Sequence, residues 1–466
     1  MRTDVDLISP LLADRPALPV TPVFEQPDGE AGESRAAKLA RLRQQLAGLG
    51  AGVCFLSALD DIAWLLNLRG ADVPFNPVFL AHALVDARQV RLFIDGSRVP
   101  GTVRARLVLD GVHIEPYAEA TEALMRLPAD CCVLIDPERT VAGLVEALPV
   151  EVRRLEAVSP VVLMKSRKNT SEQCHVRAAM EQDGAALCRF MAWFDEAVPA
   201  GGLDEFSVAA RLLEERSRNT DFRGESFGTI CAFRANAALP HYRAEPELAA
   251  RIEGGGMLLL DSGGQYPAAT TDITRMLPVG QPDAEQKRDC ARVLRGVIAL
   301  SRAVFPAGIG APMVDAIARA PIWADGIDYG HGTGHGVGCD LHVHEAPQRI
   351  AYRGRVLPHN TLESGMITSI EPGIYRPGRW GVRIENLVLA REAASTEFGE
   401  FLSFETLTLC PIDLRCIDLA VLRPDEIVWL DAYHREVRRR LEPLLEGVPL
   451  AWLRARTAAV GGQLTT

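Results

Sequence analysis

The stretch MLLLDSGGQYPAATTDITR, residues 257–275, constrains the fold more than any other part of the chain. Its apolar start is typical of a buried strand, its middle holds two glycines and a proline that favour a turn, and its end alternates again. This pattern predicts a hairpin that brings Asp261 and Asp272 together. Two ionised carboxylates in a low-dielectric interior repel each other, so their burial requires a proton or intervening cations. The stretch therefore indicates a metal site.

An alternative fits the same two residues when they are taken alone. Asp261 then ends a strand as an ordinary turn residue, and Asp272 is a polar residue on the surface. The choice depends on whether the rest of the chain supplies further ligands.

A histidine-rich segment, DYGHGTGHGVGCDLHVHEAP, covers residues 328–347 and holds four of the ten histidines: His331, His335, His342 and His344. Its glycines allow the backbone to approach a ligand closely. Histidine offers a neutral nitrogen ligand or a proton-transfer group near neutral pH. A lone histidine is more often structural, whereas four in a glycine-rich segment predict a functional site.

A second hairpin is predicted in GMITSIEPGIYRPGRWGVRIENLVLA, residues 365–390, where ITSIE and VRIENLVL flank a turn rich in proline and glycine. Glu371 ends the first strand and Glu385 lies in the second. Arg383 is two residues before Glu385, so we expect both side chains on one face. A solvated strand face is the alternative for the two glutamates.

These segments together favour the metal site over the alternatives, because they add His335, Glu371 and Glu385 to the two aspartates. Oxygen-rich ligation with one imidazole suits a pair of Mn²⁺, Co²⁺ or Zn²⁺ ions, whereas four cysteines would have indicated structural zinc.

Composition narrows the class of protein. The net charge of -11 argues against nucleic acid or an anionic membrane as the main partner. No apolar run approaches the about 20 residues that cross a bilayer, and the start MRTDVDLISP has no signal-peptide pattern, so we expect a cytoplasmic protein. The ten cysteines include no CxxC and are interpreted as reduced.

The length of 466 residues predicts two or three domains. Residues 1–34, with five prolines, are expected to form an extended linker. Residues 35–164 alternate between strands and helices and predict an α/β domain, in which ARLVLD is interpreted as a strand. From 165 to 466 we expect an α+β catalytic domain, with a C-terminal extension from about 411. Its first helix is expected to have Asn169 as N-cap and Glu172 three residues on.

At these residues the chain resembles the metallopeptidases of the pita-bread fold, which include methionine aminopeptidase, prolidase and aminopeptidase P, and is most similar to aminopeptidase P. The resemblance rests on DSGGQY, TTDITR, HGTGHGVG, VHEAP, SIEPG and VRIEN, in the order and at the spacing of the family. It covers about nine tenths of the chain. It implies a pita-bread catalytic domain behind a creatinase-like N-terminal domain, short peptides with proline at the second position as substrates, and a homodimer.

The resemblance also implies roles for the ligands. Asp261 would chelate one metal, Asp272 and Glu385 would bridge both metals, and His335 and Glu371 would complete the second. Two divalent ions, Mn²⁺ first among the candidates, would then hold a bridging hydroxide as nucleophile and polarise the peptide carbonyl. Glu371 is the candidate proton shuttle to the leaving nitrogen.

Other residues match substrate-contacting positions of the family: His241, His331 and His344, which stabilise the tetrahedral oxyanion, and Arg383. His342 has no match and is left as structural. The hypothesis for Arg69, in the NLRG turn of the N-terminal domain, is a contact with substrate or with a neighbouring subunit. A surface arginine is its alternative. Arg69→Ala is then expected to raise KM with unchanged thermal stability.

The chain departs from the family pattern in two places. Aminopeptidase P has a longer form with another domain ahead of the linker, where this chain begins. Ala269 stands where a glycine is usual, which removes no ligand.

Two further functions remain as alternatives. A prolidase has the same metal site and cleaves Xaa-Pro dipeptides only; the segment after Pro411 favours aminopeptidase P. A metal-free pita-bread binding module is the other, although its known lineages lack some of the five ligands.

Overall fold

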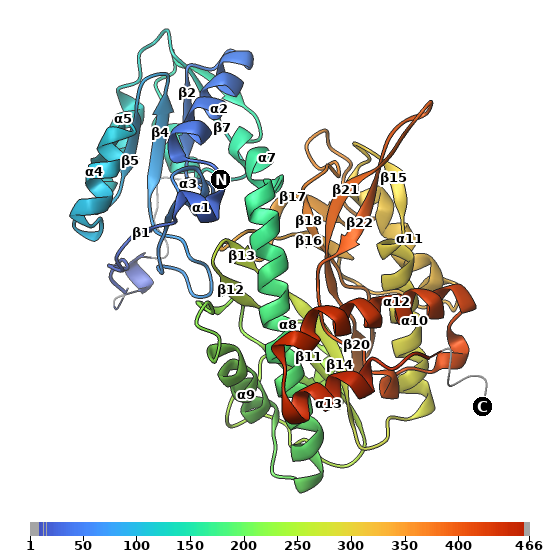
Figure 1. Cartoon of the computed structure of the whole chain (residues 1–466). Coiled ribbons are helices and arrows are strands. Elements are labelled where there is room, and N and C mark those ends of the chain that lie inside the picture. The colour runs from blue at the N-terminus through green and yellow to red at the C-terminus, as the bar shows by residue number, and fades with distance from the viewer. Residues whose placement is uncertain (1–8, 13, 15, 461–466) are drawn as a thin grey trace.

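Two lobes follow one another along the chain (Figure 1), in a computed structural model that describes residues 9–12, 14 and 16–460. The first lobe is built on a six-stranded mixed sheet of order β6-β5-β4-β2-β7-β8. Its strands are β2 (Val53–Leu56), β4 (His82–Asp86), β5 (Val90–Phe93), β6 (Val112–Glu115), β7 (Cys132–Ile135) and β8 (Arg153–Glu156). Its helices are α2 (Arg35–Gly48), α3 (Leu59–Leu65), α4 (Gly101–Leu109), α5 (Ala120–Met125), α6 (Ala142–Glu146) and α7 (Pro160–Ser166).

Both faces of this sheet are buried, as alternating residues of β2 show. Cys54 and Leu56 belong to the cluster formed with α2, α3 and α7, whereas Val53 and Phe55 belong to the cluster formed with α5 and α6. Side chains alternate between the two faces of a strand, so a central strand that is covered on both faces needs apolar residues at every position. The sequence VCFL of β2 is such a continuous apolar run.

The structure differs from two expectations for this lobe. ARLVLD is not a strand but part of α4, whose Val103 and Leu107 are one turn apart and both buried against the sheet. The last part of the expected linker is folded: β1 (Phe24–Glu25) pairs with β3 (Leu68–Arg69), and α1 (Asp28–Ala31) follows. Residues 1–8 of that linker lie outside the described part of the chain.

The second lobe begins with the long helix α8 (Thr170–Ala200), which runs from the junction of the lobes along the second one (Figure 1). Asn169 and Glu172 form the expected capping box, and Gly201 follows the last turn. The remaining helices are α9 (Glu205–Ser217), α10 (Ala284–Ser301), α11 (Ala311–Trp323), α12 (Pro424–Leu441) and α13 (Gly447–Arg456). The expected limit at residue 164 falls inside α7, which packs on the first sheet.

Two sheets of the second lobe carry the predicted hairpins. One has the order β10-β11-β14, with β10 (Ile230–Phe233), β11 (Gly256–Ser262) and β14 (Ile273–Val279). The other has the order β15-β22-β21-β18-β16-β17, with β15 (Val304–Pro306), β16 (Gly334–Gly336), β17 (Glu345–Ile350), β18 (Ile367–Ile370), β21 (Asn386–Thr396) and β22 (Gly399–Thr406).

Short ribbons interrupt both hairpins. Between β11 and β14, strand β12 (Gly264–Tyr266) pairs with β13 (Ala269–Thr270) on one side and with β9 (Gly224–Glu225) on the other. Between β18 and β21, β19 (Gly373–Arg376) pairs with β20 (Trp380–Arg383). Glu385 therefore lies in the break between β20 and β21, not inside a continuous strand as expected.

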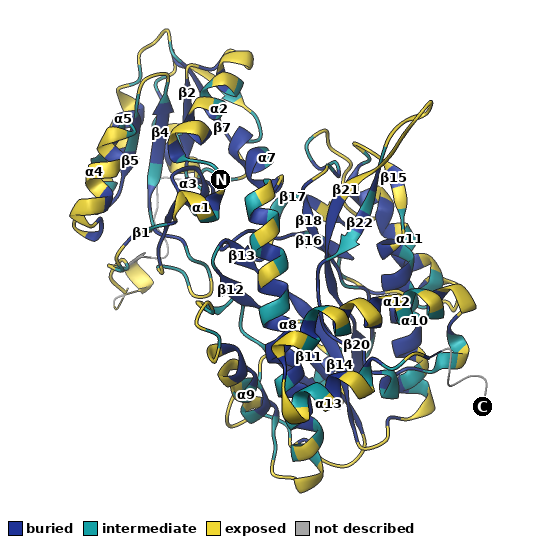
Figure 2. Cartoon of the chain, in the orientation of Figure 1, coloured by how far each residue is buried: buried dark blue, intermediate teal, exposed yellow. Residues whose placement is uncertain are grey.

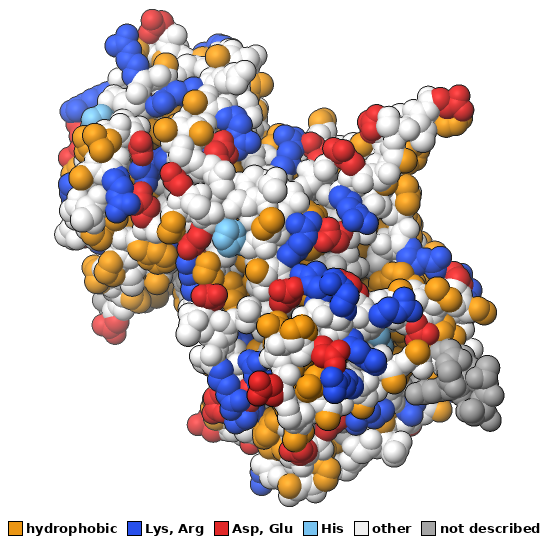
Figure 3. All heavy atoms as spheres, in the orientation of Figure 1, with side chains coloured by type: hydrophobic (Ala, Val, Ile, Leu, Met, Phe, Trp, Pro, Cys, Tyr) orange, Lys and Arg blue, Asp and Glu red, His pale blue; other side chains and the backbone are white. Residues whose placement is uncertain are grey.

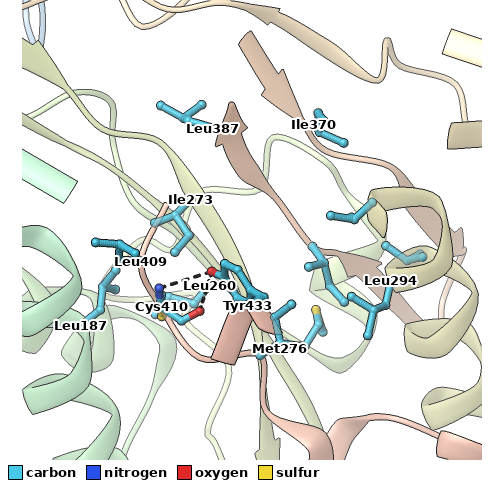
Figure 4. Close-up of a cluster of buried hydrophobic side chains, with 14 of the residues drawn as sticks. Leu187, Leu260, Ile273, Met276, Leu294, Ile370, Leu387, Leu409, Cys410 and Tyr433 are labelled. Carbon is cyan, nitrogen blue, oxygen red and sulfur yellow. Dashed lines mark hydrogen bonds between the residues drawn. The ribbon is translucent and has the colours of Figure 1, made fainter. Parts of the chain in front are cut away.

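Buried residues concentrate in the strands and on the inner faces of the helices (Figure 2). Behind the first hairpin, Leu260, Ile273 and Met276 pack in a cluster that also contains Cys410 and Tyr433 of the C-terminal segment (Figure 4). The Tyr433 hydroxyl donates to the Cys410 carbonyl at 2.8 Å. The C-terminal segment is thus part of the core that supports the hairpin.

The face of the molecule seen in Figure 3 carries no large area of a single charge sign. Basic and acidic side chains are interspersed over the face seen in Figure 3. Among the described residues, no helix combines the length and the apolar character that crossing a bilayer requires.

Candidate metal centre and active site

Predicted ligands from both hairpins and from the histidine-rich segment meet in space. Donor atoms of Asp272, His335 and Glu385 all lie within 4.8 Å of one another. His335 Nε2 is 3.6 Å from Asp272 Oδ2 and 3.4 Å from Glu371 Oε1. The charge of Asp261 acts on Asp272, Glu371 and Glu385.

Strand pairing explains this convergence. Asp261 lies near the end of β11 opposite Thr274 of β14, and Asp272 immediately precedes β14. In the second hairpin, Ile370 of β18 pairs with Asn386 of β21, so the residues beside them, Glu371 and Glu385, are neighbours at one edge of the ladder. His335 of β16 belongs to the same sheet.

Hydrogen bonds orient the ligands. Thr274 Oγ1 donates to Glu385 Oε2 at 2.9 Å, and Ser369 Oγ donates to Glu371 Oε1 at 3.2 Å. His335 Nδ1 lies 2.9 Å from the carbonyl of Gly336, which can only accept, so Nδ1 carries the proton. Its Nε2, which faces the carboxylates, is therefore left with a free lone pair.

Burial dominates the electrostatics of the cluster. It raises the pKa of Asp272 and of Glu385 well above the ordinary value, and the charges of Asp261 and Glu371 raise the pKa of both groups further. Burial likewise raises the pKa of Glu371 to about 8. It lowers the pKa of His335 to about 3, with a further contribution from His344. The carboxyl groups are thus difficult to ionise together, while the imidazole is neutral.

The cluster fits two divalent cations. The buried carboxyl groups of Asp261, Asp272 and Glu385 and the partly buried one of Glu371 face one neutral imidazole, and Arg383 supplies a single positive charge. Asp261 Oδ1 is buried, and no described residue hydrogen-bonds to it. Two divalent cations would compensate these charges, and one of them would bind that oxygen. The oxygen-rich donor set with one nitrogen is typical of such sites.

Arg383 holds a ligand in place. Its Nη2 donates to Asp261 Oδ2 at 2.6 Å, its Nε to Thr274 Oγ1 at 3.2 Å and its Nη1 to the Tyr375 hydroxyl at 2.8 Å. The side chain is only 3% exposed. The substrate contact expected from the sequence stays a prediction, and the structure adds this contact with Asp261.

Tyr375 was missed by the sequence analysis. Its hydroxyl lies between Arg383 Nη1 and His331 Nε2, each at 2.8 Å. Gly373 pairs with Arg383 across the β19–β20 ribbon, and the missing side chain of the glycine leaves space for the Tyr375 ring. A Cβ atom on Gly373 would lie only 2.6 Å from the Tyr375 hydroxyl oxygen. The glycine opposite Arg383 is the sequence signal from which this contact could have been predicted.

The predicted substrate histidines surround the cluster. His331 is half-buried, and burial lowers its pKa to about 4. His344 is exposed, and its ring stands edge-on to that of His335 with centroids 4.3 Å apart. His241 is also exposed, and its charge lowers the pKa of both His331 and His344, which places the three in one region. His342 Nδ1 donates to the His344 carbonyl at 2.6 Å, which is a structural contact.

A cavity of about 210 Å³ adjoins His331. Three arginines contribute to its walls, Arg319, Arg349 and Arg353. Arg319 is paired with Asp315 at 2.9 Å and Asp328 at 2.7 Å. Arg349 of β17 lies opposite His335 and is exposed. A recess lined in part by arginines therefore adjoins His331.

Arg69 does not lie on the surface or at the cluster. It is 1% exposed, and its guanidinium donates to the carbonyls of Ala63, Leu68, Cys339 and Asp340. The expectation of a direct substrate contact with unchanged stability on removal is wrong, because a buried guanidinium with these partners is part of the packing between the lobes.

The fold and this buried set of four carboxylates and one imidazole define a dinuclear metallohydrolase. Residues 174–392 match Metallopeptidase family M24, residues 14–172 match the Creatinase/Prolidase N-terminal domain, and residues 400–460 match the C-terminal region of peptidase M24. The chain belongs to metallopeptidase family M24, with a pita-bread catalytic unit behind a creatinase-type N-terminal domain.

Similar proteins carry related names. The chain is 38% identical to Xaa-Pro aminopeptidase 2 of Sus scrofa, over 96% of this chain and 67% of that protein. It is 39% identical to aminopeptidase P2 of Arabidopsis thaliana and 40% identical to a probable Xaa-Pro aminopeptidase P of Laccaria bicolor. These matches cover 90% and 95% of this chain, and 63% and 70% of the relatives, so the chain spans about two thirds of their length.

Solved structures of similar proteins have the same fold. The X-prolyl aminopeptidase of Caenorhabditis elegans, described as a cytosolic enzyme with a di-nuclear active site, is 32% identical with a TM-score of 0.91, over 98% of this chain and 76% of that one. The prolidase of Pyrococcus horikoshii OT3 has a TM-score of 0.61 at 24% identity, over 81% of this chain and 99% of that one, which shows a shared fold alone.

Proposed function

We propose that this chain is a metal-dependent Xaa-Pro aminopeptidase, which hydrolyses the peptide bond between an N-terminal residue and a penultimate proline. The observation that carries the proposal is the convergence of Asp272, His335 and Glu385, beside Glu371 and Asp261, in a buried cluster with excess negative charge. The names of relatives at 38% to 40% identity support the choice of substrate class.

Two divalent cations would be held by Asp261, Asp272, His335, Glu371 and Glu385, with Asp272 and Glu385 shared between them. Mn²⁺ is the first candidate, with Co²⁺ and Zn²⁺ as alternatives, because the donor set is mostly oxygen. When bound, such a pair supplies Lewis acidity and an activated water at neutral pH.

The chain supplies the remaining functions. Glu371 carries a proton to the leaving nitrogen, since its carboxylate lies beside the other ligands, 3.4 Å from His335 Nε2, where it can accept a proton from the activated water and pass it on. His331 is fixed by Tyr375 and contacts the substrate. His344 and His241 are exposed beside the cluster and stabilise the oxyanion. Arg383 acts by holding Asp261.

The test is an assay of the purified chain with Mn²⁺, Co²⁺ or Zn²⁺ on Xaa-Pro dipeptides and on longer Xaa-Pro peptides. We expect release of the N-terminal residue from the longer peptides. Cleavage of dipeptides alone would identify a prolidase, and no metal-dependent cleavage of either would favour a binding module. An Xaa-Ala peptide of equal length is the matched control, and its equal cleavage would contradict selectivity for proline.

We also propose a cytoplasmic location and a homodimer. The ten unpaired cysteines and the cytosolic description of the C. elegans enzyme support the location. The homodimer stays a prediction from the family resemblance, and the mass in solution tests it. Peptides, not nucleic acid, are the proposed partners, in keeping with the net charge of -11.

A further inference from the structure

The loop between β16 and β17, residues 337–344, carries His342 and His344 and is called the histidine loop below. The His344 ring makes no hydrogen bond to any described residue, and its only ring contacts are with His335 and His342. Its position is therefore set by the backbone of the loop. The first lobe holds the turn and the end of that backbone, as three groups of contacts show, while Gln265, Thr270 and Ile367 of the second lobe hold other parts of it.

Arg69 holds the turn of the loop. Asp340 has a φ of +52°, a left-handed conformation that is strained for residues other than glycine, asparagine and aspartate. Arg69 Nε donates to the Asp340 carbonyl at 2.6 Å, and Nη2 donates to the Cys339 carbonyl at 3.2 Å. The same guanidinium uses Nη1 to bind the carbonyls of Ala63 and Leu68, at 3.2 and 2.9 Å. One planar group thus joins the first lobe to the turn.

Buried charges accompany this contact. Asp340 is fully buried and lies 3.7 Å from Arg69 Nε, and Arg223 also pairs with its carboxylate. Arg223 in turn reaches Glu30 Oε2 at 3.2 Å. Removing one partner of such a buried set leaves a charge without compensation, so the arrangement tolerates little displacement.

Lysines hold the other end of the loop. Glu345 begins β17 directly after His344, and its carboxylate pairs with Lys168 and lies 3.7 Å from Lys165. Lys165, on α7, also pairs with Asp60 and lies 3.2 Å from Asp61, both on α3. The residue next to His344 is thereby connected to two helices of the first lobe.

The middle of the loop is embedded as well. The Leu341 side chain is fully buried in the hydrophobic cluster of the first lobe. Its carbonyl accepts a hydrogen bond from Gln265 Nε2 at 2.8 Å, and the same amide donates to the Phe75 carbonyl of the first lobe at 3.0 Å. Gln265 lies in β12, between the two aspartate ligands along the chain.

We propose that the first lobe is a positioning clamp for His344, with Arg69 at the turn and Lys165 and Lys168 at the end of the histidine loop. Arg69 is a positioning residue: it sets the distance between the His344 ring and the metal cluster through the backbone of residues 339–344. The proposal rests on the proposed role of His344 in the reaction. Under this proposal, Arg69 affects kcat without touching the substrate.

Arg69→Lys tests the clamp, because a lysine keeps the charge but cannot bridge four carbonyl groups. Arg35→Lys is the matched control. Arg35 is also buried in the first lobe, donates to the Leu66 carbonyl at 2.7 Å and pairs with Glu25 at 2.7 Å, but its hydrogen bonds and ion pairs within the described part of the chain do not reach the histidine loop. We expect both variants to lose thermal stability, and only Arg69→Lys to lose kcat, by about tenfold or more with KM nearly unchanged.

Glu345→Gln is a second variant, at the other end of the loop, should Arg69→Lys fold poorly. It weakens the charge pairs with Lys165 and Lys168 but preserves the size of the side chain. A loss of kcat at full metal content supports the clamp. Wild-type kcat in this variant and in Arg69→Lys, or an equal loss of kcat in Arg35→Lys, would overturn it.

A double-mutant cycle with His344→Ala separates the clamp from the role of His344 itself. If Arg69 acts through His344, Arg69→Lys lowers kcat in the wild-type background and leaves it unchanged in the His344→Ala background. A further tenfold loss in that background would overturn the clamp alone. Wild-type kcat in His344→Ala would overturn the proposed role of His344, and the clamp with it.

Discussion

Arg383 Nη2 lies 2.6 Å from Asp261 Oδ2, a buried ion pair that joins the second hairpin to the first. The other oxygen of Asp261 has no hydrogen-bond partner among the described residues. One oxygen is thus fixed by the guanidinium, while the other is buried and left available to a cation. Arg383 therefore selects the rotamer in which Asp261 is able to serve as a ligand.

Arg383→Met is expected to lower the metal content below two ions per chain and kcat by more than tenfold. Breaking a buried ion pair by removing one partner costs about 3–5 kcal/mol, and here it also frees a ligand to rotate. Metal analysis after gel filtration, together with kcat, measures both effects. Arg415→Met is the control, since Arg415 pairs with Asp195 at 2.7 Å and with Asp413, away from the ligands. Two metals and full activity in Arg383→Met would refute the assignment.

Shared ligands are expected to behave differently from the oxyanion histidine. Asp272→Asn or Glu385→Gln removes a donor that both metals use, so metal content and turnover are both lost. His344→Ala removes a transition-state contact only, so it keeps two metals and loses rate. Metal content and kcat of the three purified variants distinguish the roles. Equal metal loss in all three would contradict this division.

The metal-free protein is expected to lose stability as pH rises toward neutrality. The folded-state pKa of Glu371 is raised to about 8, from an ordinary value of 4.5. The folded chain therefore binds more protons than the unfolded chain between these values, and its stability falls with rising pH. His335, with a pKa lowered to about 3, has the opposite effect below its ordinary value of 6.5. The clean window is therefore pH 6.5 to about 7, because the buried Lys38, whose pKa is lowered to about 7, has the opposite effect at higher pH.

Thermal unfolding across that window, with and without metal, measures this effect. Bound cations stabilise the ionised carboxylates, so the metal-loaded protein should show a much smaller slope. Glu371→Gln cannot ionise at this position and should reduce the slope of the metal-free protein. A metal-free Tm that rises with pH through this window would be incompatible with the buried carboxyl cluster.

Arg275 is expected to couple the C-terminal segment to the metal centre. It donates to the carbonyls of Glu385 at 2.7 Å, Cys410 at 2.9 Å and Pro411 at 3.1 Å, and to the Tyr433 hydroxyl at 2.8 Å. Arg275→Lys leaves several buried acceptors without donors, at about 1–3 kcal/mol each, and should lower both Tm and metal content.

Tyr433→Phe is the graded variant for this coupling. It removes one hydroxyl of the cluster drawn in Figure 4 and keeps the ring in the core. We expect a smaller loss of Tm, of about 1 kcal/mol in unfolding free energy, with two metals retained. A Tyr433→Phe loss that equals or exceeds that of Arg275→Lys would show that the arginine is not the link.

Local sequence patterns were sufficient for much of the fold. The apolar run and turn residues around 257–275 predicted the β11–β14 hairpin, and the Asn169–Glu172 spacing predicted the start of α8. Those signals succeed because caps, turns and strand periodicity depend on residues a few positions apart. The strand prediction for ARLVLD was wrong for a related reason. A short apolar run fits a strand or one face of a helix equally well, and tertiary packing selected the helix α4.

The sequence by itself determined which side chains are available as ligands: two aspartates, two glutamates and one histidine, in segments whose turns bring them near one another. Only the tertiary structure decided the roles of the arginines. Arg69 meets Asp340 across 271 positions, and Arg383 meets Asp261 across 122. A charged side chain is exposed by default, and its burial depends on carbonyl and carboxylate partners that distant segments supply. No local pattern contains those partners, because they exist only once the two lobes and the two hairpins have packed together.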